Sequence, residues 1–249
     1  MMSERQLLVT ERDLGATIDM ALNPRQIAPG FISRQAEIAG PVPLPPWFID
    51  RCRQVYLSIP TDESAGHRLI GITSTSHGEG KTSLAIGMAM AVAADTQDPT
   101  LLVECDLEQP ALSRLFGFQP RPGLSDWLEG AANLRIIRAA PLANLFLIPA
   151  GSPPSDPARM FYQLSDSKLM AELKPRFQNV IIDLPPMLNI AYSSLATKLA
   201  DRIVLVARYG VTPIDDIEQS VFLLGRERLV GVVLNGTDYK TPEWLRRAF

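Results

Sequence analysis

The sequence predicts an α/β domain with a doubly wound, mostly parallel sheet and helices on both faces. One observation is that the strand-like apolar runs are short and lack polar alternation, which is typical of strands buried on both faces. The other is that longer amphipathic segments separate these runs, so strands and helices alternate along the chain. In such folds the ligand site lies at the carboxyl ends of the strands.

The elements follow from the same pattern, taken in chain order. Strands are expected at 69–73, 100–104, 145–149, 179–183, 202–207 and 229–235. Helices are expected at 47–59, 81–94, 156–173, 191–199 and 213–226, where apolar residues recur at helical spacing.

Residues 1–46 differ from the rest, because they hold six of the 21 prolines and include the run PVPLPP. Such a run favours an extended linker. We therefore expect a flexible proline-rich arm over 1–46, or a segment that docks on a partner, with a short helix at 10–22 as an option. The folded domain is expected over 47–249.

Composition excludes several classes of protein. The 249 residues are 46% hydrophobic, which is ample for a packed core. A net charge of -3 gives no positive field for phosphate backbones, so nucleic acid is not expected as a partner. Two cysteines cannot build a disulfide framework, and the longest apolar run, 85–94, is too short to cross a membrane. The charged N-terminus also lacks the apolar core of a signal peptide, so a cytoplasmic location is expected.

A phosphate-binding loop is predicted directly after the first strand, where residues 74–82 read STSHGEGKT. Gly78 and Gly80 allow a tight turn, and the following helix points its positive end at an anion. The Lys81 ammonium suits the β- and γ-phosphates, and the Thr82 hydroxyl suits Mg²⁺. Thr75 stands where the usual motif has glycine, so a chance Gly-rich turn is the alternative. The expected nucleotide-binding residues are Gly78, Glu79, Gly80, Lys81, Thr82 and Ser83.

Two predicted strands end in acidic residues, which supports a magnesium site. Glu104 and Asp106 are two residues apart at the end of one strand, so alternation predicts that they share a face. Asp183 ends another strand, as in a Walker B motif. A carboxylate beside bound Mg²⁺ can hold the ion directly or through water. Solvated strand ends are the alternative.

These motifs together resemble the deviant-Walker P-loop ATPases of the MinD/ParA superfamily (SIMIBI type), and within it the bacterial tyrosine kinases (BY-kinases) of capsule and exopolysaccharide systems. The resemblance covers about residues 48–240. The matching segments are SxxxGEGKT (74–82), LLVECDLEQP (101–110), GLSDWLEG (123–130), LIPAGSPPSDPARM (147–160), NVIIDLPP (179–186), ADRIVLVARYGVT (200–212) and LVGVVLN (229–235).

The resemblance implies ATP and Mg²⁺ as cofactors and assigns a role to each matching residue. Lys81 would hold the phosphates, and Asn235 would contact the adenine base. The ligands of Mg²⁺ would be Thr82 and Asp106, with Asp183 in the Walker B position. Glu104 would accept the proton of an attacking tyrosine hydroxyl or water. The implied catalytic set is Lys81, Glu104, Asp106 and Asp183.

The sequence also departs from that family. Glu104 stands where the family usually has aspartate, and Glu108 replaces a common basic residue. The oligomer-forming pattern Glu-x-x-Arg-x-x-Arg is reduced to Asp50-x-x-Arg53-x-x-Tyr56. In place of a C-terminal tyrosine cluster there is only Tyr239. Ser76 stands where ParA and MinD proteins usually carry a lysine.

The resemblance therefore implies a cytoplasmic tyrosine autokinase of polysaccharide biosynthesis and export that transfers or hydrolyses the γ-phosphate of ATP. It would act at the inner face of the membrane through a membrane-anchored polysaccharide co-polymerase or chain-length determinant protein, and homo-oligomers are an open possibility. Two alternatives stay open: a catalytically degenerate nucleotide-binding regulator of such a partner, and a ParA/MinD-type ATPase.

Overall fold

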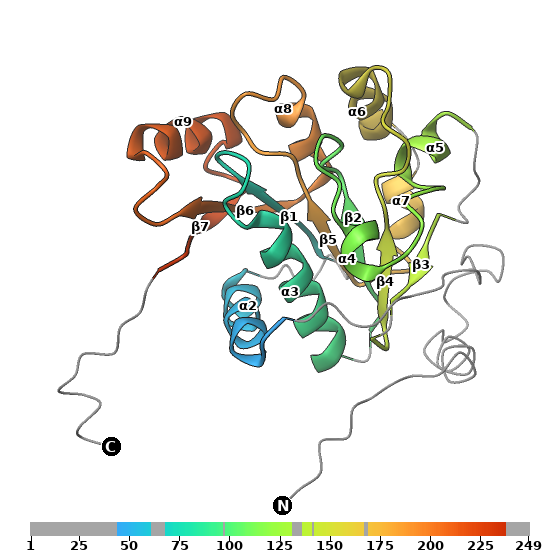
Figure 1. Ribbon diagram of the computed structural model, residues 1–249, viewed down its shortest axis with the longest axis horizontal. Coiled ribbons are helices and arrows are strands. Elements are labelled where there is room, and N and C mark those ends of the chain that lie inside the picture. Colours follow the sequence, from blue (N-terminus) through green and yellow to red (C-terminus); the bar gives the residue numbers. More distant parts are fainter. Residues whose placement is uncertain are drawn as a thin grey trace, which may run out of the picture.

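A seven-stranded sheet forms the centre of the protein and has helices on both faces (Figure 1). The computed structural model describes residues 44–60, 68–96, 98–130, 136–140, 142–166 and 169–237. The strand order is β3-β4-β2-β5-β1-β6-β7, and every neighbouring pair is parallel except the antiparallel pair β3 and β4. The predicted fold class is thus confirmed.

The six predicted strands are all present, and one more is added at the edge. The strands are β1 (Arg68–Ser74), β2 (Thr100–Glu104), β3 (Arg138–Ala139), β4 (Leu145–Ile148), β5 (Asn179–Asp183), β6 (Arg202–Arg208) and β7 (Leu229–Asn235). The two-residue strand β3 was not predicted, because so short a run carries no pattern.

The helices agree with the expectation for the long segments and differ for the short ones. They are α2 (Pro46–Ser58), α3 (Lys81–Asp95), α4 (Leu112–Phe116), α5 (Leu124–Leu128), α6 (Pro157–Asp166), α7 (Leu169–Leu173), α8 (Ser193–Ala196) with a 3-10 turn η1 (Thr197–Leu199), and α9 (Ile214–Leu224). The single helix expected over 156–173 is two helices, and the five-residue helices α4 and α5 were not predicted.

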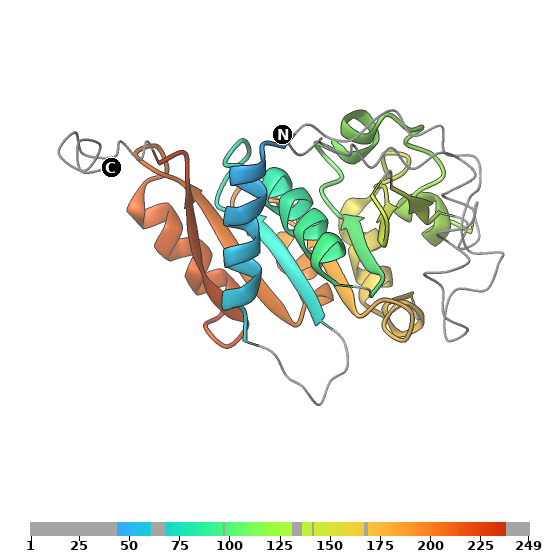
Figure 2. The same ribbon diagram turned by 90° about the horizontal axis from the view of Figure 1, so that it is seen from below.

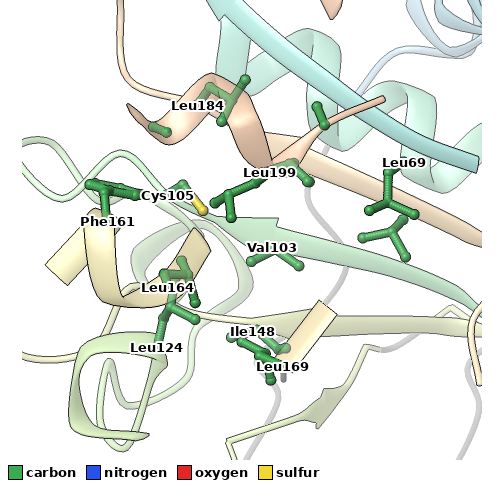
Figure 3. Close-up of a cluster of buried hydrophobic side chains, with 14 of the residues drawn as sticks. Leu69, Val103, Cys105, Leu124, Ile148, Phe161, Leu164, Leu169, Leu184 and Leu199 are labelled. Carbon is green, nitrogen blue, oxygen red and sulfur yellow. The ribbon is translucent and has the colours of Figure 1, made fainter. Parts of the chain in front are cut away.

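Each face of the sheet has its own apolar core. Helices α2, α3 and α4 cover one face, where Cys52, Met88 and Phe116 pack against Ile72 and Ile181. Helices α5 to α9 cover the other, and Figure 3 shows part of that core, with side chains from strands and helices meeting in one layer. Because both faces are covered, the open edge at the carboxyl ends of the strands is left for a ligand.

The predictions for the arm over 1–46 and for Tyr239 concern residues that lie almost entirely outside the described ranges. Within those ranges, no helix combines the length and the apolar character needed to cross a bilayer.

Candidate functional site

The loop between β1 and α3 has the backbone shape of an anion site. Gly78 and Gly80 have φ of 78° and 100°, in the left-handed region that favours glycine. Gly80 is also fixed by close packing, because a Cβ there would lie 2.2 Å from Asn235 Nδ2. The loop ends directly at α3, whose first N–H groups have no partner within the helix. The predicted strand–loop–helix arrangement is therefore present.

The Glu79 carboxylate shapes this loop from inside. Its Oε2 atom accepts hydrogen bonds from the backbone N–H groups of Thr75 (2.8 Å) and Ser76 (3.0 Å). Its Oε1 atom accepts a 2.5 Å hydrogen bond from the hydroxyl of Thr212, which follows β6. The Glu79 side chain is buried, so its negative charge supports the loop backbone and does not face the ligand directly. Sequence reasoning placed Glu79 in the loop but did not find this role.

Lys81 lies between the carboxylates of two neighbouring strands. Its Nζ atom donates a 2.6 Å hydrogen bond to Asp106 Oδ2 and lies 3.6 Å from Asp183 Oδ1. Thr82, the next residue, donates from its hydroxyl to Asp183 Oδ2 at 2.8 Å. The sheet register explains why Asp183 lies beside Lys81 and Thr82, because Asp183 on β5 pairs with Ile72 near the end of β1. The structure thus brings together Lys81, Thr82, Asp106 and Asp183.

Burial and charge act against each other in this cluster. Burial raises the pKa of Asp183 to about 6, and the ammonium of Lys81 offsets only part of that rise. Burial would lower the pKa of Lys81, but Asp183 and Asp106 overcome this effect and raise it. Two buried carboxylates face one ammonium, so the cluster carries excess negative charge that a cation would balance.

The donor set fits Mg²⁺ in the presence of phosphates. Asp183 Oδ1 is buried and accepts no hydrogen bond from any described residue, so it is free to hold a cation. Mg²⁺ prefers oxygen ligands and commonly binds through one or two carboxylates together with substrate phosphates. Across the described ranges, no group of three or more His, Cys, Asp or Glu side chains could hold a metal by itself. Asp183, Asp106 and the Thr82 hydroxyl therefore match a site that a nucleotide completes.

Glu104 pairs with Asp183 across the sheet, but backbone N–H groups occupy its carboxylate. Its Oε1 atom accepts hydrogen bonds from the backbone N–H groups of Ala111 (2.5 Å) and Leu112 (2.7 Å), and its Oε2 atom accepts one from Ala150 (3.0 Å). Asp106 instead faces Lys81, so the expected sharing of one spot by the two acids is not seen. The strand ends at Glu104, and the two-residue alternation does not extend past a strand end. The carboxylate of Glu104 joins the start of α4 to the end of β4.

Asn235, at the end of β7, contacts the phosphate loop. Its Nδ2 atom donates to the backbone oxygen of Glu79 at 2.9 Å, and its Oδ1 atom accepts from the N–H of Gly236 at 2.9 Å. The strand end and the loop are therefore held together by one side chain. The role toward the base stays a prediction.

A cavity of about 360 Å³ lies in front of this cluster. Lys81, Thr82 and Ser83, three of the residues predicted to bind a nucleotide, border it from α3. Residues that sequence reasoning missed also border it, namely His77, Gln109 and Arg114. Arg114 lies on α4 and has no hydrogen bond or ion pair with any other described residue. No sequence signal marks it, because a five-residue helix shows no periodicity.

Comparison with known proteins gives sequence relatives, among them named tyrosine kinases. No protein-family model matches the chain. The tyrosine-protein kinase wzc of Salmonella typhimurium is 29% identical over 174 residues, which is 69% of this chain and 24% of that protein. The tyrosine-protein kinase CpsD of Streptococcus pneumoniae serotype 4 is 28% identical over 204 residues, 79% of this chain and 89% of that protein. The succinoglycan biosynthesis transport protein ExoP of Rhizobium meliloti is 31% identical over 69% of this chain and 22% of its own length.

This chain is a homologue of the bacterial tyrosine kinases. Solved structures agree: the kinase domain of VpsO has a TM-score of 0.64 and 27% identity, over 77% of this chain and 100% of that one. The kinase domain of the Escherichia coli tyrosine kinase ETK has a TM-score of 0.69 at 22% identity, over 78% of each chain, and so shows the shared fold. MinD of Pyrococcus horikoshii, solved with Mg-ADP, has a TM-score of 0.59 at 22% identity, over 73% of this chain and 76% of that one. This kinase homologue spans only about a quarter of the length of wzc.

Proposed function

We propose that this kinase homologue binds ATP with Mg²⁺ and acts as a tyrosine-kinase-like ATPase of capsule or exopolysaccharide export. The observation that carries the proposal is the buried Lys81 ammonium between Asp106 and Asp183, at the foot of a glycine loop. A cation in that position suits the β- and γ-phosphates of a nucleotide. Two of the related proteins, wzc and CpsD, are tyrosine kinases by name, which supports the choice of reaction.

The chain's own residues would contribute positioning and charge, which is most of what phosphoryl transfer requires. A phosphate oxygen would replace Asp106 as the hydrogen-bond partner of Lys81 Nζ. Asp106 and Asp183, together with the Thr82 hydroxyl, are the groups that would hold Mg²⁺. Bound Mg²⁺ would supply positive charge against the phosphate oxygens. Arg114 borders the same cavity and would add a second positive charge, which would compensate for Glu108 in place of the family's common basic residue.

A calorimetric titration with Mg-ATP tests this proposal. Lys81→Met should lower the affinity at least tenfold, because it removes the buried charge that faces the phosphates. Lys198→Met is the matched control, since Lys198 is exposed on η1 and should leave the affinity unchanged. Equal affinity of wild type and Lys81→Met would refute the phosphate site.

The reaction itself is tested by mass spectrometry after incubation with Mg-ATP. Phosphotyrosine on the protein supports the kinase, and release of ADP without phosphotyrosine supports a hydrolase. MinD of Pyrococcus furiosus, which is 25% identical and is named a cell division ATPase, supports the hydrolase as the ParA/MinD-type alternative. The name of ExoP, a succinoglycan biosynthesis transport protein, supports a setting in polysaccharide export. The partner we propose there is a membrane-anchored polysaccharide co-polymerase, and membrane association would come through it.

A second candidate function is a nucleotide-binding regulator without kinase activity. The three backbone hydrogen bonds on Glu104 favour it, because they occupy the carboxylate that a tyrosine hydroxyl would need. In that case Mg-ATP binds normally, while neither phosphotyrosine nor ADP forms. Either product would exclude this candidate.

A further inference from the structure

The two edges of the sheet differ in how well they are protected. β3, the outermost strand on one side, has only two residues and offers little backbone for pairing. β7, the outermost strand on the other side, has seven residues without a charge or a proline, and its pairing with β6 is irregular only near its start. Proteins usually protect an edge by shortening it or by placing charges or proline on it. Within the described ranges no further strand pairs with β7, so its outer backbone groups are available.

Exposed apolar side chains gather at this edge. Seven of the ten large hydrophobic side chains that are exposed in the described part of the chain fall between positions 209 and 234. Val232 and Leu234 lie on β7 itself, and Ile214 and Phe222 lie on α9, where Phe222 is 84% exposed. Figure 1 and Figure 2 show β7 at one end of the molecule, with α9 on one side of it and α2 on the other. An apolar surface of this kind is typical of a protein–protein interface.

The charges beside β7 differ between its two ends. Asp215 and Asp216 are in the first turn of α9, which follows the carboxyl end of β6. Arg226 and Arg228 follow α9 and precede the amino end of β7. Since β6 and β7 are parallel, the acidic turn lies at the carboxyl end of both strands and the arginines lie at their amino end. One charge of opposite sign at each end offsets only part of this difference, namely Arg208 and Glu227.

A second copy of the chain matches this surface. Two identical edge strands that pair antiparallel about a two-fold axis continue the sheet through both molecules, and each supplies the hydrogen-bonding groups that the other lacks. The same rotation brings the acidic turn at Asp215 of one copy beside Arg226 of the other, and it does so twice. A parallel arrangement would instead bring like charges together, which is unfavourable.

Residues 238–249, which follow β7 in the sequence, are a poorer partner for this edge. Five of these twelve residues are charged and one is a proline. Charged residues are depleted in strands, and a proline cannot donate a hydrogen bond to a neighbouring strand. The uncharged sequence of β7 has neither disadvantage, so pairing with its own copy is favoured.

Helix α2 offers less for association than this edge does. Arg53 belongs to the reduced form of the family's oligomer-forming pattern. Its guanidinium donates to Asp50 and, at 3.0 Å, to Asp95 of the same chain. These bonds within the chain occupy the arginine that the pattern would use between copies.

We infer that β7 and α9 form a two-fold dimer interface with a second copy of this chain, in which the two β7 strands pair antiparallel. A stable interface buries about 1,200–2,000 Å² in total, more than two edge strands supply, so the apolar side chains of α9 contribute the rest. The inference does not depend on the proposed function. In an antiparallel pair the carboxyl ends of the two sheets point in opposite directions, so the dimer forms without nucleotide and leaves both phosphate cavities open.

Sedimentation velocity on the full chain without nucleotide tests for the dimer, at concentrations from about 1 to 100 μM. We expect a reversible shift from monomer to dimer across this range. Amide hydrogen exchange at the same concentrations locates the interface. Exchange in peptides that cover 229–235 should slow at least threefold as the dimer forms, because edge N–H groups gain partners.

Substitutions then test the edge and the charges separately. Val232→Lys should weaken dimerisation at least tenfold, because each copy then places a charge on the paired edge. Tyr162→Lys is the matched control, since Tyr162 is also an exposed hydrophobic residue but lies on α6, away from β7, and it should change dimerisation less than twofold (Figure 1). Asp215→Arg should weaken the dimer about tenfold, and Arg226→Asp added to the same chain should restore it to within about threefold. Far-UV circular dichroism checks that each variant is folded.

Several results would overturn the inference. They include a monomer at every concentration and a dimer that Val232→Lys weakens less than twofold. A dimer that forms only with Mg-ATP would also overturn it, because the nucleotide face would then be the interface. Protection of 229–235 that is equal at all concentrations would show that another part of the same chain covers β7. A charge exchange that fails to restore the dimer would refute the antiparallel arrangement.

Discussion

Replacing Glu104 with glutamine separates a structural role of its carboxylate from a catalytic one. The carboxylate accepts three buried backbone hydrogen bonds, at Ala111, Leu112 and Ala150. Glutamine keeps one oxygen for the first two donors, but its NH₂ group then faces the N–H of Ala150. One buried N–H without a partner costs about 1–3 kcal/mol, and the two retained bonds each lose about 1 kcal/mol of charge assistance. We expect Glu104→Gln to lower the free energy of unfolding by about 3 kcal/mol.

Guanidinium chloride unfolding, followed by far-UV circular dichroism, measures this loss. The matched control is Glu108→Gln, a neighbouring acid whose side chain is 48% exposed, and it should change stability by less than about 0.5 kcal/mol. Nucleotide affinity is measured on the same samples at a temperature where both variants are folded. Because Glu104 does not contact the loop residues Lys81 and Thr82, we expect Mg-ADP affinity to stay within about threefold of wild type.

The opposite pattern would refute this reasoning. If Glu104→Gln unfolds at the same denaturant concentration as wild type but abolishes turnover, the carboxylate is a proton acceptor and its backbone contacts contribute little. Burial raises the pKa of Glu104, and its three backbone hydrogen bonds reduce that rise. A loss of both stability and turnover would agree with the structural role. Glu104 holds the end of the loop 105–111, and this loop positions Asp106 beside Lys81.

Other substitutions test separate parts of the structure. Arg114→Ala should weaken Mg-ATP more than Mg-ADP, by about tenfold against twofold in titrations, because Arg114 borders the same cavity as Lys81 and its charge would act on the additional phosphate; equal losses would contradict this. Gly87→Ala should lower the free energy of unfolding by about 1–2 kcal/mol in thermal unfolding because the added methyl group would clash with Cys52, and Cys52→Ala in the same chain should restore part of the loss. Asp126 accepts hydrogen bonds from the Ser152 hydroxyl (2.6 Å) and the Gly123 N–H (2.8 Å), which outweigh its burial and lower its pKa. Asp126→Asn should therefore cost about 1–2 kcal/mol at pH 7, and the difference from wild type should vanish as the pH falls below 3.8, where the folded carboxyl titrates; a constant difference down to pH 2.5 would contradict it.

Sequence predicts the sheet and the phosphate loop well because both rest on local rules. A strand buried on both faces is a short apolar run wherever it occurs, and a glycine loop before Lys81 needs only adjacent residues. The direction of the Glu104 side chain does not follow from such rules, because partners at 111, 112 and 150 decide it. The same holds for Arg114, whose place depends on where α4 packs.

The phosphate loop also depends on parts of the chain made much later. The Thr212 hydroxyl donates to the Glu79 carboxylate, and Asn235 donates to the Glu79 backbone oxygen; these residues follow Glu79 by 133 and 156 positions. During synthesis the glycines are therefore present long before the contacts that shape them. Nucleotide binding should begin only when β7 pairs with β6. The proposed nucleotide would therefore stabilise the completed sheet and would not stabilise earlier folding intermediates.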